Sequence, residues 1–380
     1  MAGIYIHIPY CRQACHYCDF HFSTSLKTKD DLVKALMKEA RLQQNYFSGW
    51  LKPGRQLETV YLGGGTPSLL SGDELKLLLD VLINTFPVSP VAEITLEANP
   101  DDLTKEKLLA LRQAGINRLS IGIQSFRDED LRFMNRLHTA AQAEASVTRA
   151  QDTGIPNISI DLIYGTPTLN AEGWKQNLEA AFALEVPHLS CYALTVEEKT
   201  ALSHFIRSGK TVAPDELHIE EQFNTLVKLT GEKGFEHYEI SNFAKEGFHS
   251  RHNSSYWSGQ PYLGLGPAAH SFIGNRRQWN VRNNPSYIKS IEEGKIPCET
   301  EELTVNQRFN EYVMISLRTR TGMDLEKVKS EFGNDFVSHL LKEIETPVAE
   351  GLVEKKENQI VITGKGKLFA DRIASDLFVV

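Results

Sequence analysis

Residues 3–18 read Gly3-Ile-Tyr-Ile-His-Ile-Pro-Tyr-Cys11-Arg-Gln-Ala-Cys15-His-Tyr-Cys18. Isoleucine alternates with tyrosine and histidine through residue 8, which is the period of a β-strand, and the proline that follows ends it. Three cysteines come directly afterwards. This stretch therefore predicts a strand whose carboxyl end leads into a loop of thiols.

The same alternation of strand and helix continues through the first 200 residues. Further strands are expected at 57–62, 93–97, 118–123, 157–163 and 188–194. Helices are expected between them at 30–47, 71–86, 104–114, 140–153 and 171–184. Six such units predict an α/β fold with a parallel sheet. The pattern alone fits an open doubly wound sheet or a complete or partial TIM-like barrel, and in each case ligands bind at the carboxyl ends of the strands.

Polar and glycine-rich segments follow four of these strands. They are Tyr-Leu-Gly-Gly-Gly-Thr-Pro at 61–67, Leu-Glu-Ala-Asn-Pro at 96–100, Gly-Ile-Gln-Ser-Phe at 122–126 and Asp-Leu-Ile-Tyr-Gly-Thr-Pro at 161–167. Because the carboxyl ends of parallel strands share one edge, these segments and the cysteine loop are expected to meet there.

The strand–helix rhythm stops near residue 200, so we expect three parts: a barrel at 1–200, an α+β region at 201–300 and a small C-terminal domain at 301–380. In the last part Thr304 and Gln307 form a capping-box pattern. Helices are expected at 304–318, 324–332 and 335–350, with a hairpin at 354–362, which together suggest a winged-helix-like unit.

Composition limits the classes of partner. The chain of 380 residues has a net charge of −8 and 41% hydrophobic residues, so it offers no overall attraction to nucleic acid. No stretch reaches the apolar length of a membrane span and no cationic leader precedes the first strand. We therefore expect a cytoplasmic protein without nucleic-acid partners, which touches a membrane at most peripherally and through another protein.

Five cysteines, three of them clustered, fit a disulfide framework poorly. Cys11, Cys15 and Cys18 offer thiolates to three irons of a [4Fe–4S] cluster and leave the fourth iron open to a small chelating ligand. The alternative is a zinc site in which His21 supplies a fourth ligand. Of the other two thiols, Cys191 is expected in the core, and Cys298 has no predicted role.

The combination of the cysteine loop, Tyr17 within it and the Gly-Gly-Gly-Thr-Pro loop after the second strand resembles the radical-SAM superfamily. Residues 8–11, 15–20 and 161–165 are similar to the branch that contains oxygen-independent coproporphyrinogen III oxidase and the HemW haem chaperones. The resemblance covers nearly the whole chain. It implies a partial (β/α)6 barrel, a [4Fe–4S] cluster and bound S-adenosylmethionine (SAM).

The resemblance also implies which side chains contact SAM. The set lies on the first strand, the cysteine loop and the following strand ends: Tyr5, Tyr17, Gly64, Gly65, Thr66, Glu97, Gln124, Arg136, Asp161 and Ala193. Their chemistry suits the ligand, because glycines expose backbone N–H groups, Arg136 can pair with a carboxylate, and Glu97 or Asp161 can accept from an ammonium group or ribose hydroxyls.

Two features bear on whether the chain acts on a tetrapyrrole or carries haem. The oxidase pattern has a further cysteine two positions after the third, where this chain has Phe20. Residues 252–257, His-Asn-Ser-Ser-Tyr-Trp, match a signature of the HemW proteins. Imidazole is a common axial haem ligand, so His252 is the first candidate for haem, with His237, His249 and His270 as alternatives.

The sequence therefore predicts a haem chaperone that binds a [4Fe–4S] cluster, SAM and haem and delivers haem to an apo-haemoprotein acceptor. No catalytic residue is assigned. The alternative is a radical-SAM enzyme that acts on a tetrapyrrole, either an oxygen-independent coproporphyrinogen III oxidase or a methyltransferase. Phe20 argues against the oxidase in particular.

Overall fold

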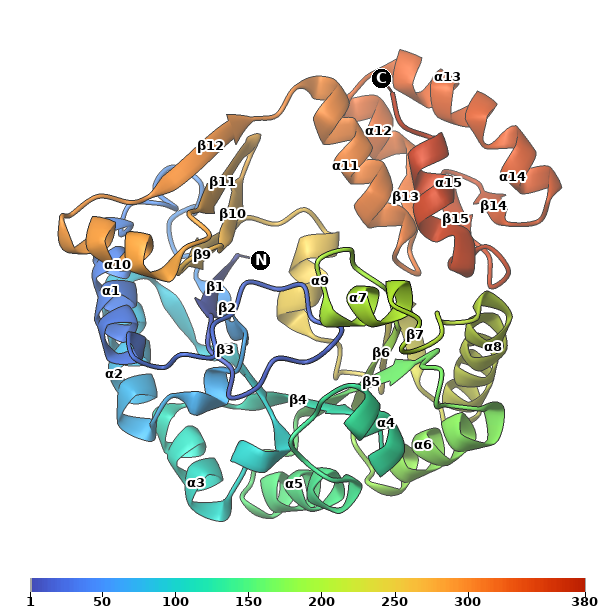
Figure 1. The fold of residues 1–380 in the computed structure, drawn as a ribbon. Coiled ribbons are helices and arrows are strands. Elements are labelled where there is room, and N and C mark those ends of the chain that lie inside the picture. The colour runs from blue at the N-terminus through green and yellow to red at the C-terminus, as the bar shows by residue number, and fades with distance from the viewer. Residues whose placement is uncertain (1, 380) are drawn as a thin grey trace.

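The computed structural model describes residues 2–379, and its centre is a 12-stranded sheet in the order β12-β11-β10-β9-β1-β2-β3-β4-β5-β6-β8-β7 (Figure 1). The six central strands run parallel and curve into a partial barrel. They are β1 (Gly3–Ile8), β2 (Leu57–Gly64), β3 (Val88–Ala98), β4 (Arg118–Gln124), β5 (Ile158–Tyr164) and β6 (His188–Ala193). Every strand predicted from the sequence is present, so the parallel sheet is confirmed.

Helices cover the outside of the curved sheet (Figure 1). They are α1 (Lys29–Leu42), α2 (Gly72–Thr85), α3 (Lys105–Ala114), α5 (Ala140–Asp152) and α6 (Ala171–Ala183). The short α4 (Asp128–Phe133) instead packs against Tyr17 of the cysteine loop. Polar side chains fix where several of them begin. Ser71 and Thr139 each form a capping box with the residue three positions on, which satisfies backbone N–H groups in the first turn.

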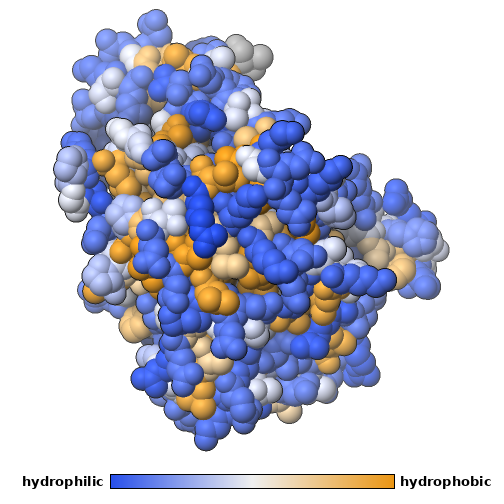
Figure 2. Space-filling view, turned by 90° about the vertical axis from the view of Figure 1, so that its left-hand side faces the viewer, coloured by the Kyte–Doolittle hydropathy of each residue, from blue (hydrophilic) through white to orange (hydrophobic). Residues whose placement is uncertain are grey.

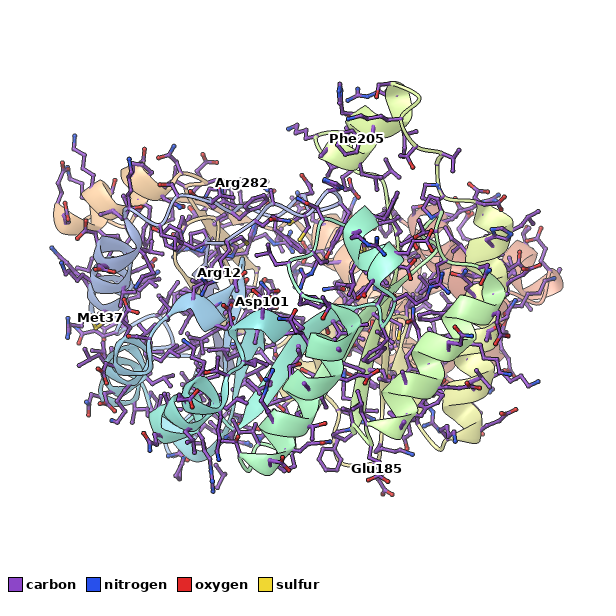
Figure 3. The ribbon with its side chains drawn as sticks, turned by 60° about the horizontal axis from the view of Figure 1, so that its bottom comes forward. Arg12, Met37, Asp101, Glu185, Phe205 and Arg282 are labelled. Carbon is purple, nitrogen blue, oxygen red and sulfur yellow. The ribbon has the colours of Figure 1, made fainter. Side chains whose placement is uncertain are left out.

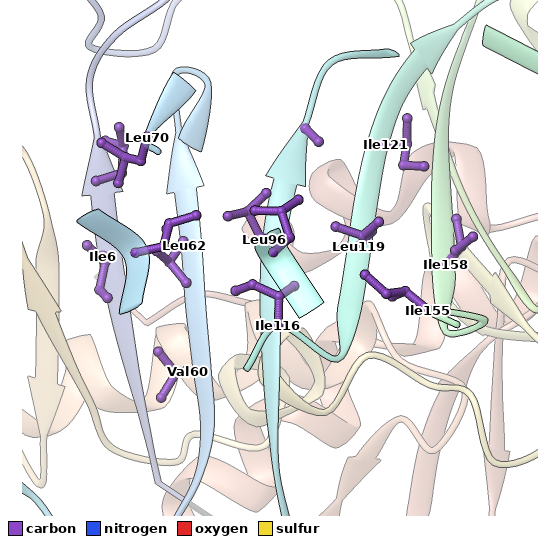
Figure 4. Packing of buried hydrophobic residues seen from close by; sticks show 14 of the residues in the cluster. Ile6, Val60, Leu62, Leu70, Leu96, Ile116, Leu119, Ile121, Ile155 and Ile158 are labelled. Carbon is purple, nitrogen blue, oxygen red and sulfur yellow. The ribbon is translucent and has the colours of Figure 1, made fainter. Parts of the chain in front are cut away.

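The hydrophobic core lies between the strands and these helices. Ile4, Ile6 and Ile8 of β1 are fully buried, and the apolar residues of the next strands continue the same layer (Figure 4). Side chains buried to this degree each stabilise the fold by about 1.5–3 kcal/mol. The core thereby holds the strands in register and sets where their carboxyl ends lie.

Residues 236–302 add strands to both edges of the barrel sheet. Beside β1 lie β9 (Tyr262–Leu265), which is parallel to it, and then the antiparallel β10 (His270–Ile273), β11 (Arg276–Asn280) and β12 (Cys298–Glu302). Beside β6 lie β8 (Asn242–Ala244) and β7 (Glu236–Glu239). Four helices lie between residues 201 and 300: α7 (Ala201–Arg207), α8 (Glu216–Glu232), α9 (Arg251–Trp257) and α10 (Asn284–Glu292). The division of the chain at residues 200 and 300 stays a prediction.

The C-terminal part has a core of its own, centred on Phe309, Val313 and Leu340. Its elements are α11 (Val305–Leu317), β13 (Met323–Asp324), α12 (Leu325–Glu331), α13 (Asn334–Glu343), α14 (Glu345–Ala349), β14 (Val353–Lys356), β15 (Gln359–Ile362) and α15 (Ala370–Asp376). The predicted helices and hairpin are confirmed, although the helix expected over 335–350 is divided near Ile344. The winged-helix comparison stays a prediction.

The C-terminal part contacts strands at both edges of the sheet. On the β7 side, the backbone N–H of Ile240 donates to Arg318 O at 3.1 Å and that of Arg320 donates to Tyr238 O at 3.0 Å. On the β11 side, Arg277 and Glu311 form an ion pair of 2.7 Å. It therefore bridges the two sides that the curved sheet leaves apart.

The surface on the side of α1, α10 and β12 mixes polar side chains with apolar ones, which gather near the middle of the view (Figure 2). None of the helices within residues 2–379 has both the length and the apolar character needed to cross a lipid bilayer.

Candidate functional site

The polar strand ends meet at one end of the barrel, as the parallel sheet requires. Arg12 of the cysteine loop and Asp101, which follows β3, lie at this end, whereas Glu185 lies at the opposite end (Figure 3). The guanidinium of Arg12 pairs with the neighbouring Asp102 at 3.1 Å. The cysteine loop therefore covers the carboxyl ends of the strands.

Backbone hydrogen bonds hold the cysteine loop in place. The N–H of Cys11 donates to Ser23 O at 3.0 Å, and the N–H of His16 donates to Met134 O at 3.2 Å. The side chain of Gln13 donates to the backbone oxygen of Asn135 at 2.9 Å. The loop is thus fixed to the segment after α4, which carries Arg136.

A chain of side-chain hydrogen bonds joins two of the thiols. Thr66 Oγ1 donates to Cys11 Sγ at 3.5 Å, and Asn99 Nδ2 donates to Thr66 Oγ1 at 3.1 Å. Arg136 donates to Asn99 Oδ1 at 2.7 Å through Nη2 and to Cys15 Sγ at 3.4 Å through Nη1. These donors would stabilise the negative charge of thiolates that bind iron. Asn99 was missed from the sequence, where an asparagine before a proline indicates only a turn.

The donor set of the loop fits an iron–sulfur cluster. All three cysteines are free and half-buried, and burial raises the pKa of Cys11 and raises that of Cys18 to about 11. Among residues 2–379 no three histidine, cysteine or acidic side chains are grouped so that they could hold a metal ion. A [4Fe–4S] cluster takes one thiolate on each of three irons, and the cysteine loop offers that number of thiols.

The zinc alternative depends on His21 as the fourth ligand. Its Nε2 hydrogen-bonds Asn284 Oδ1 at 2.7 Å, and its ring stacks on that of His7. Nε2 of His21 is therefore engaged by Asn284, and only Nδ1 would remain for a metal.

Two half-buried carboxyl groups lie on the barrel strands, that of Glu97 on β3 and that of Asp161 on β5. Glu97 accepts from Tyr61 Oη at 2.9 Å and from the backbone N–H of Gly64 at 3.0 Å. Burial raises the pKa of Glu97 to about 7, and that of Asp161 to about 6. Asp161 accepts from Ser120 Oγ at 3.2 Å. Half-buried carboxyl groups whose pKa lies near neutral pH favour a cationic ligand, because its charge stabilises their ionised form.

The remaining residues of the predicted SAM set occupy the same end of the barrel or its interior. Tyr5 stacks on Tyr61 inside the barrel, and Tyr17 packs into a small apolar cluster beside Arg136. Gly65 touches the start of the cysteine loop, since a Cβ at this position would lie 2.7 Å from Tyr10 O. The others, Gln124 and Ala193, end β4 and β6.

The predicted haem residue His252 lies inside the barrel wall. Only 1% of its surface is exposed, and burial lowers its pKa to about 3. Its Nδ1 hydrogen-bonds Thr59 Oγ1 and its Nε2 hydrogen-bonds Tyr256 Oη, both at 2.8 Å. Haem ligation by His252 stays a prediction that requires one of these hydrogen bonds to open.

The alternative histidines lie in different surroundings. His237 is bonded through Nε2 to Ile240 O at 3.0 Å and through Nδ1 to Lys367 at 2.7 Å. His249 faces Glu236 at 3.2 Å. His270 is exposed and lies at the wall of a cavity of about 870 Å³ between the end of the cysteine loop and β10 to β12.

Known proteins share this architecture. The family model of the radical SAM superfamily matches residues 5–181, and that of the HemN C-terminal domain matches residues 303–369. The solved coproporphyrinogen III oxidase HemN of Escherichia coli, described as a radical SAM enzyme, superposes with a TM-score of 0.86 over 100% of this chain and 90% of its own, at 24% identity. That likeness shows the fold.

Relatives with similar sequences identify the family to which this chain belongs. The heme chaperone HemW of Bacillus subtilis is 34% identical over 98% of both chains, and the heme chaperone HemW of Escherichia coli is 37% identical over 71% of this chain and 70% of its own. With relatives this similar along the chain, and with the thiol loop and strand ends arranged as described, the protein belongs to the radical-SAM superfamily and, within it, to the HemW family.

Proposed function

We propose that this protein is a haem chaperone of the cytoplasm, which binds haem reversibly and delivers it to an apo-haemoprotein. The observation that carries the proposal is the relationship to heme chaperone HemW over 98% of both chains. The alignment with this relative extends over the barrel, the added strands and the C-terminal part. It therefore covers every segment that the function would use.

Membership of the radical-SAM superfamily implies a [4Fe–4S] cluster and SAM. We assign the cluster to Cys11, Cys15 and Cys18, with Thr66 and Arg136 as donors to two of the sulfurs. When bound and reduced, such a cluster supplies an electron to the sulfonium of SAM. SAM would in turn be held by the predicted set, with Glu97 or Asp161 accepting from its cationic amine or ribose.

The second candidate function is radical-SAM chemistry on a tetrapyrrole. The fold shared with coproporphyrinogen III oxidase favours it, yet at 24% identity that likeness extends to the fold alone. Phe20 occupies the position at which the oxidase pattern has a cysteine, and its side chain is 72% exposed beside the thiols. The site therefore lacks a thiol there.

One anaerobic experiment distinguishes the two functions. The full chain, reconstituted with iron and sulfide, is divided and incubated either with coproporphyrinogen III, SAM and a reductant, or with haem followed by an apo-haemoprotein. We expect stoichiometric haem binding and transfer, and no decarboxylated product. A Cys11→Ser, Cys15→Ser, Cys18→Ser triple variant serves as the cluster-free control.

Catalytic formation of protoporphyrinogen would overturn the proposed chaperone function and favour the radical-SAM enzyme. Failure of the wild-type chain to bind haem would also overturn the proposal. Iron and sulfide contents measured on the same sample report whether the cluster was present.

A further inference from the structure

The cavity beside the cysteine loop has the size and composition of a ligand site. Its volume of about 870 Å³ lies within the range of pockets that bury a cofactor. One wall comes from Tyr5 and His7 of β1 and from Phe20 after the thiols, and the other comes from β10, β11 and the segment that leads into β12. Segments far apart in the sequence therefore enclose it.

The strand wall presents one histidine with free ring nitrogens. His270 pairs with Trp279, and Trp279 with Glu299, in the register of three antiparallel strands, so the three side chains share a face of the sheet. The rings of His270 and Trp279 stack with centroids 6.2 Å apart. Among the described residues the His270 ring contacts Trp279 and lies near the charges of Arg277 and Arg282, and neither of its nitrogens makes a hydrogen bond.

The two other histidines of the cavity are engaged. His7 Nδ1 hydrogen-bonds Tyr5 Oη at 3.1 Å, and His7 Nε2 hydrogen-bonds His21 O at 2.9 Å. His21 is bonded to Asn284 through Nε2. A metal that enters the cavity therefore meets both ring nitrogens of His270, whereas His21 offers only Nδ1 and His7 offers neither.

The cavity also carries an apolar surface and a cation. Phe20, 72% exposed, and Val281 offer apolar contact, while Trp279 offers a flat aromatic face. Arg282, labelled at the same end of the molecule as Arg12 in Figure 3, uses Nη2 to donate to Asp19 O at 2.8 Å. Its other N–H groups remain to pair with a carboxylate.

These features match the chemistry of haem, a flat apolar macrocycle with a central iron and two carboxylate side chains. We propose that haem binds in this cavity, with His270 as axial ligand, Trp279 and Phe20 against the macrocycle and Arg282 at a propionate. The inference rests on the proposed haem-carrying function and deepens it by locating the site. Glu299 lies on the same face of the sheet as His270 and its carboxylate would repel the propionates. The propionates therefore lie on the side of Arg282.

The site gives His252 a different role from ligation. His252 hydrogen-bonds Tyr256 and stacks on Tyr5, and both of these tyrosines line the cavity. His252 is therefore a positioning residue behind the wall. Its loss should weaken haem binding without changing the axial ligand, whereas loss of His270 should change the ligand itself.

Haem titration of the full, cluster-loaded chain tests the assignment by absorption and magnetic circular dichroism. We expect His270→Ala to weaken binding about tenfold or more and to abolish the signature of histidine ligation, which free imidazole restores. His252→Ala should keep that signature. His218→Ala, which removes an exposed histidine of α8 away from the cavity, should match the wild type.

The propionate contact is tested with the dimethyl ester of haem. The wild type should bind haem more tightly than the ester, by about tenfold, and Arg282→Gln should remove this difference.

The outcomes distinguish a failure of the proposed haem-carrying function from a failure of the proposed haem site. If the wild type binds no haem, the proposed function fails. If the wild type binds haem and His270→Ala retains both affinity and ligand signature, the function stands and this site is wrong. Loss of the signature in His252→Ala alone would move the ligand to His252.

Discussion

Asn99 links the two halves of the thiol environment, because it bonds Thr66 on one side and Arg136 on the other. The sequence identified Thr66 and Arg136 through a family motif. Asn99 was not predicted from the sequence, because its role depends on how the ends of β2, β3 and β4 meet in space. Residues with motif chemistry are thus predictable, whereas residues that connect them require the fold.

We expect Asn99→Ala to lower the affinity for SAM about tenfold, since Arg136 and Thr66 lose the hydrogen bonds that orient them. Iron and sulfide contents should stay unchanged, because no thiol is removed. Calorimetry of SAM binding and metal analysis check both points, with the exposed Asn334→Ala as control. An unchanged affinity for SAM in Asn99→Ala would contradict the assignment.

Glu97 should make SAM binding depend on pH. Burial raises the pKa of Glu97 to about 7, so below this pH the carboxyl group carries a proton that a cationic ligand must displace. Affinity for SAM should therefore fall about tenfold between pH 8 and pH 6. Titrations across this range on wild type and Glu97→Gln test the expectation. An equally steep profile in Glu97→Gln would assign the proton to another group.

At the scale of elements, Glu39 of α1 organises the added strands around it. It is fully buried and accepts from Tyr287 Oη at 2.5 Å, Asn280 Nδ2 at 2.7 Å and the N–H of Gly266 at 2.8 Å. The carboxylate of Glu39 therefore holds helix, strand and turn together behind the cavity wall.

The six barrel strands were predictable because long runs of apolar residues in the sequence indicate buried strands. The partners of β7 to β12 were not, since short strands at 236–302 give no signal of which distant edge they join.

Glu39→Leu should lower the free energy of unfolding by about 3 kcal/mol, because it removes the carboxylate that accepts from four buried donors, those above and Gln43 Nε2. Glu39→Gln retains one acceptor oxygen and should cost less. Denaturation in urea measures both, with the exposed Glu292→Leu on α10 as control. Equal stability of Glu39→Leu and wild type would show that this network contributes nothing.

At the scale of the whole molecule, the C-terminal part joins the two sides of an incomplete barrel. Its own core was predictable from its helical periodicity and capping box. Its position was not, since the contacts of Arg318 and Arg320 with the β7 side and of Glu311 with Arg277 are single polar contacts between remote segments.

The Arg277–Glu311 pair should couple the C-terminal part to the sheet. Both side chains are partly buried, so a double-mutant cycle with Arg277→Ala and Glu311→Ala should give a coupling energy of about 1 kcal/mol. The exposed pair Lys76 and Asp80 within α2 provides a matched cycle in which less coupling is expected. Strict additivity at Arg277 and Glu311 would show that the two parts are held by other contacts.

Cys18 and Phe20 stand two residues apart on one loop, yet one faces the cluster site and the other the cavity. Loss of a cluster held by Cys18 would remove a constraint on the segment that carries Phe20 at the wall of the cavity. We expect cluster-free protein to bind haem with altered affinity, which parallel titrations of the two forms would measure.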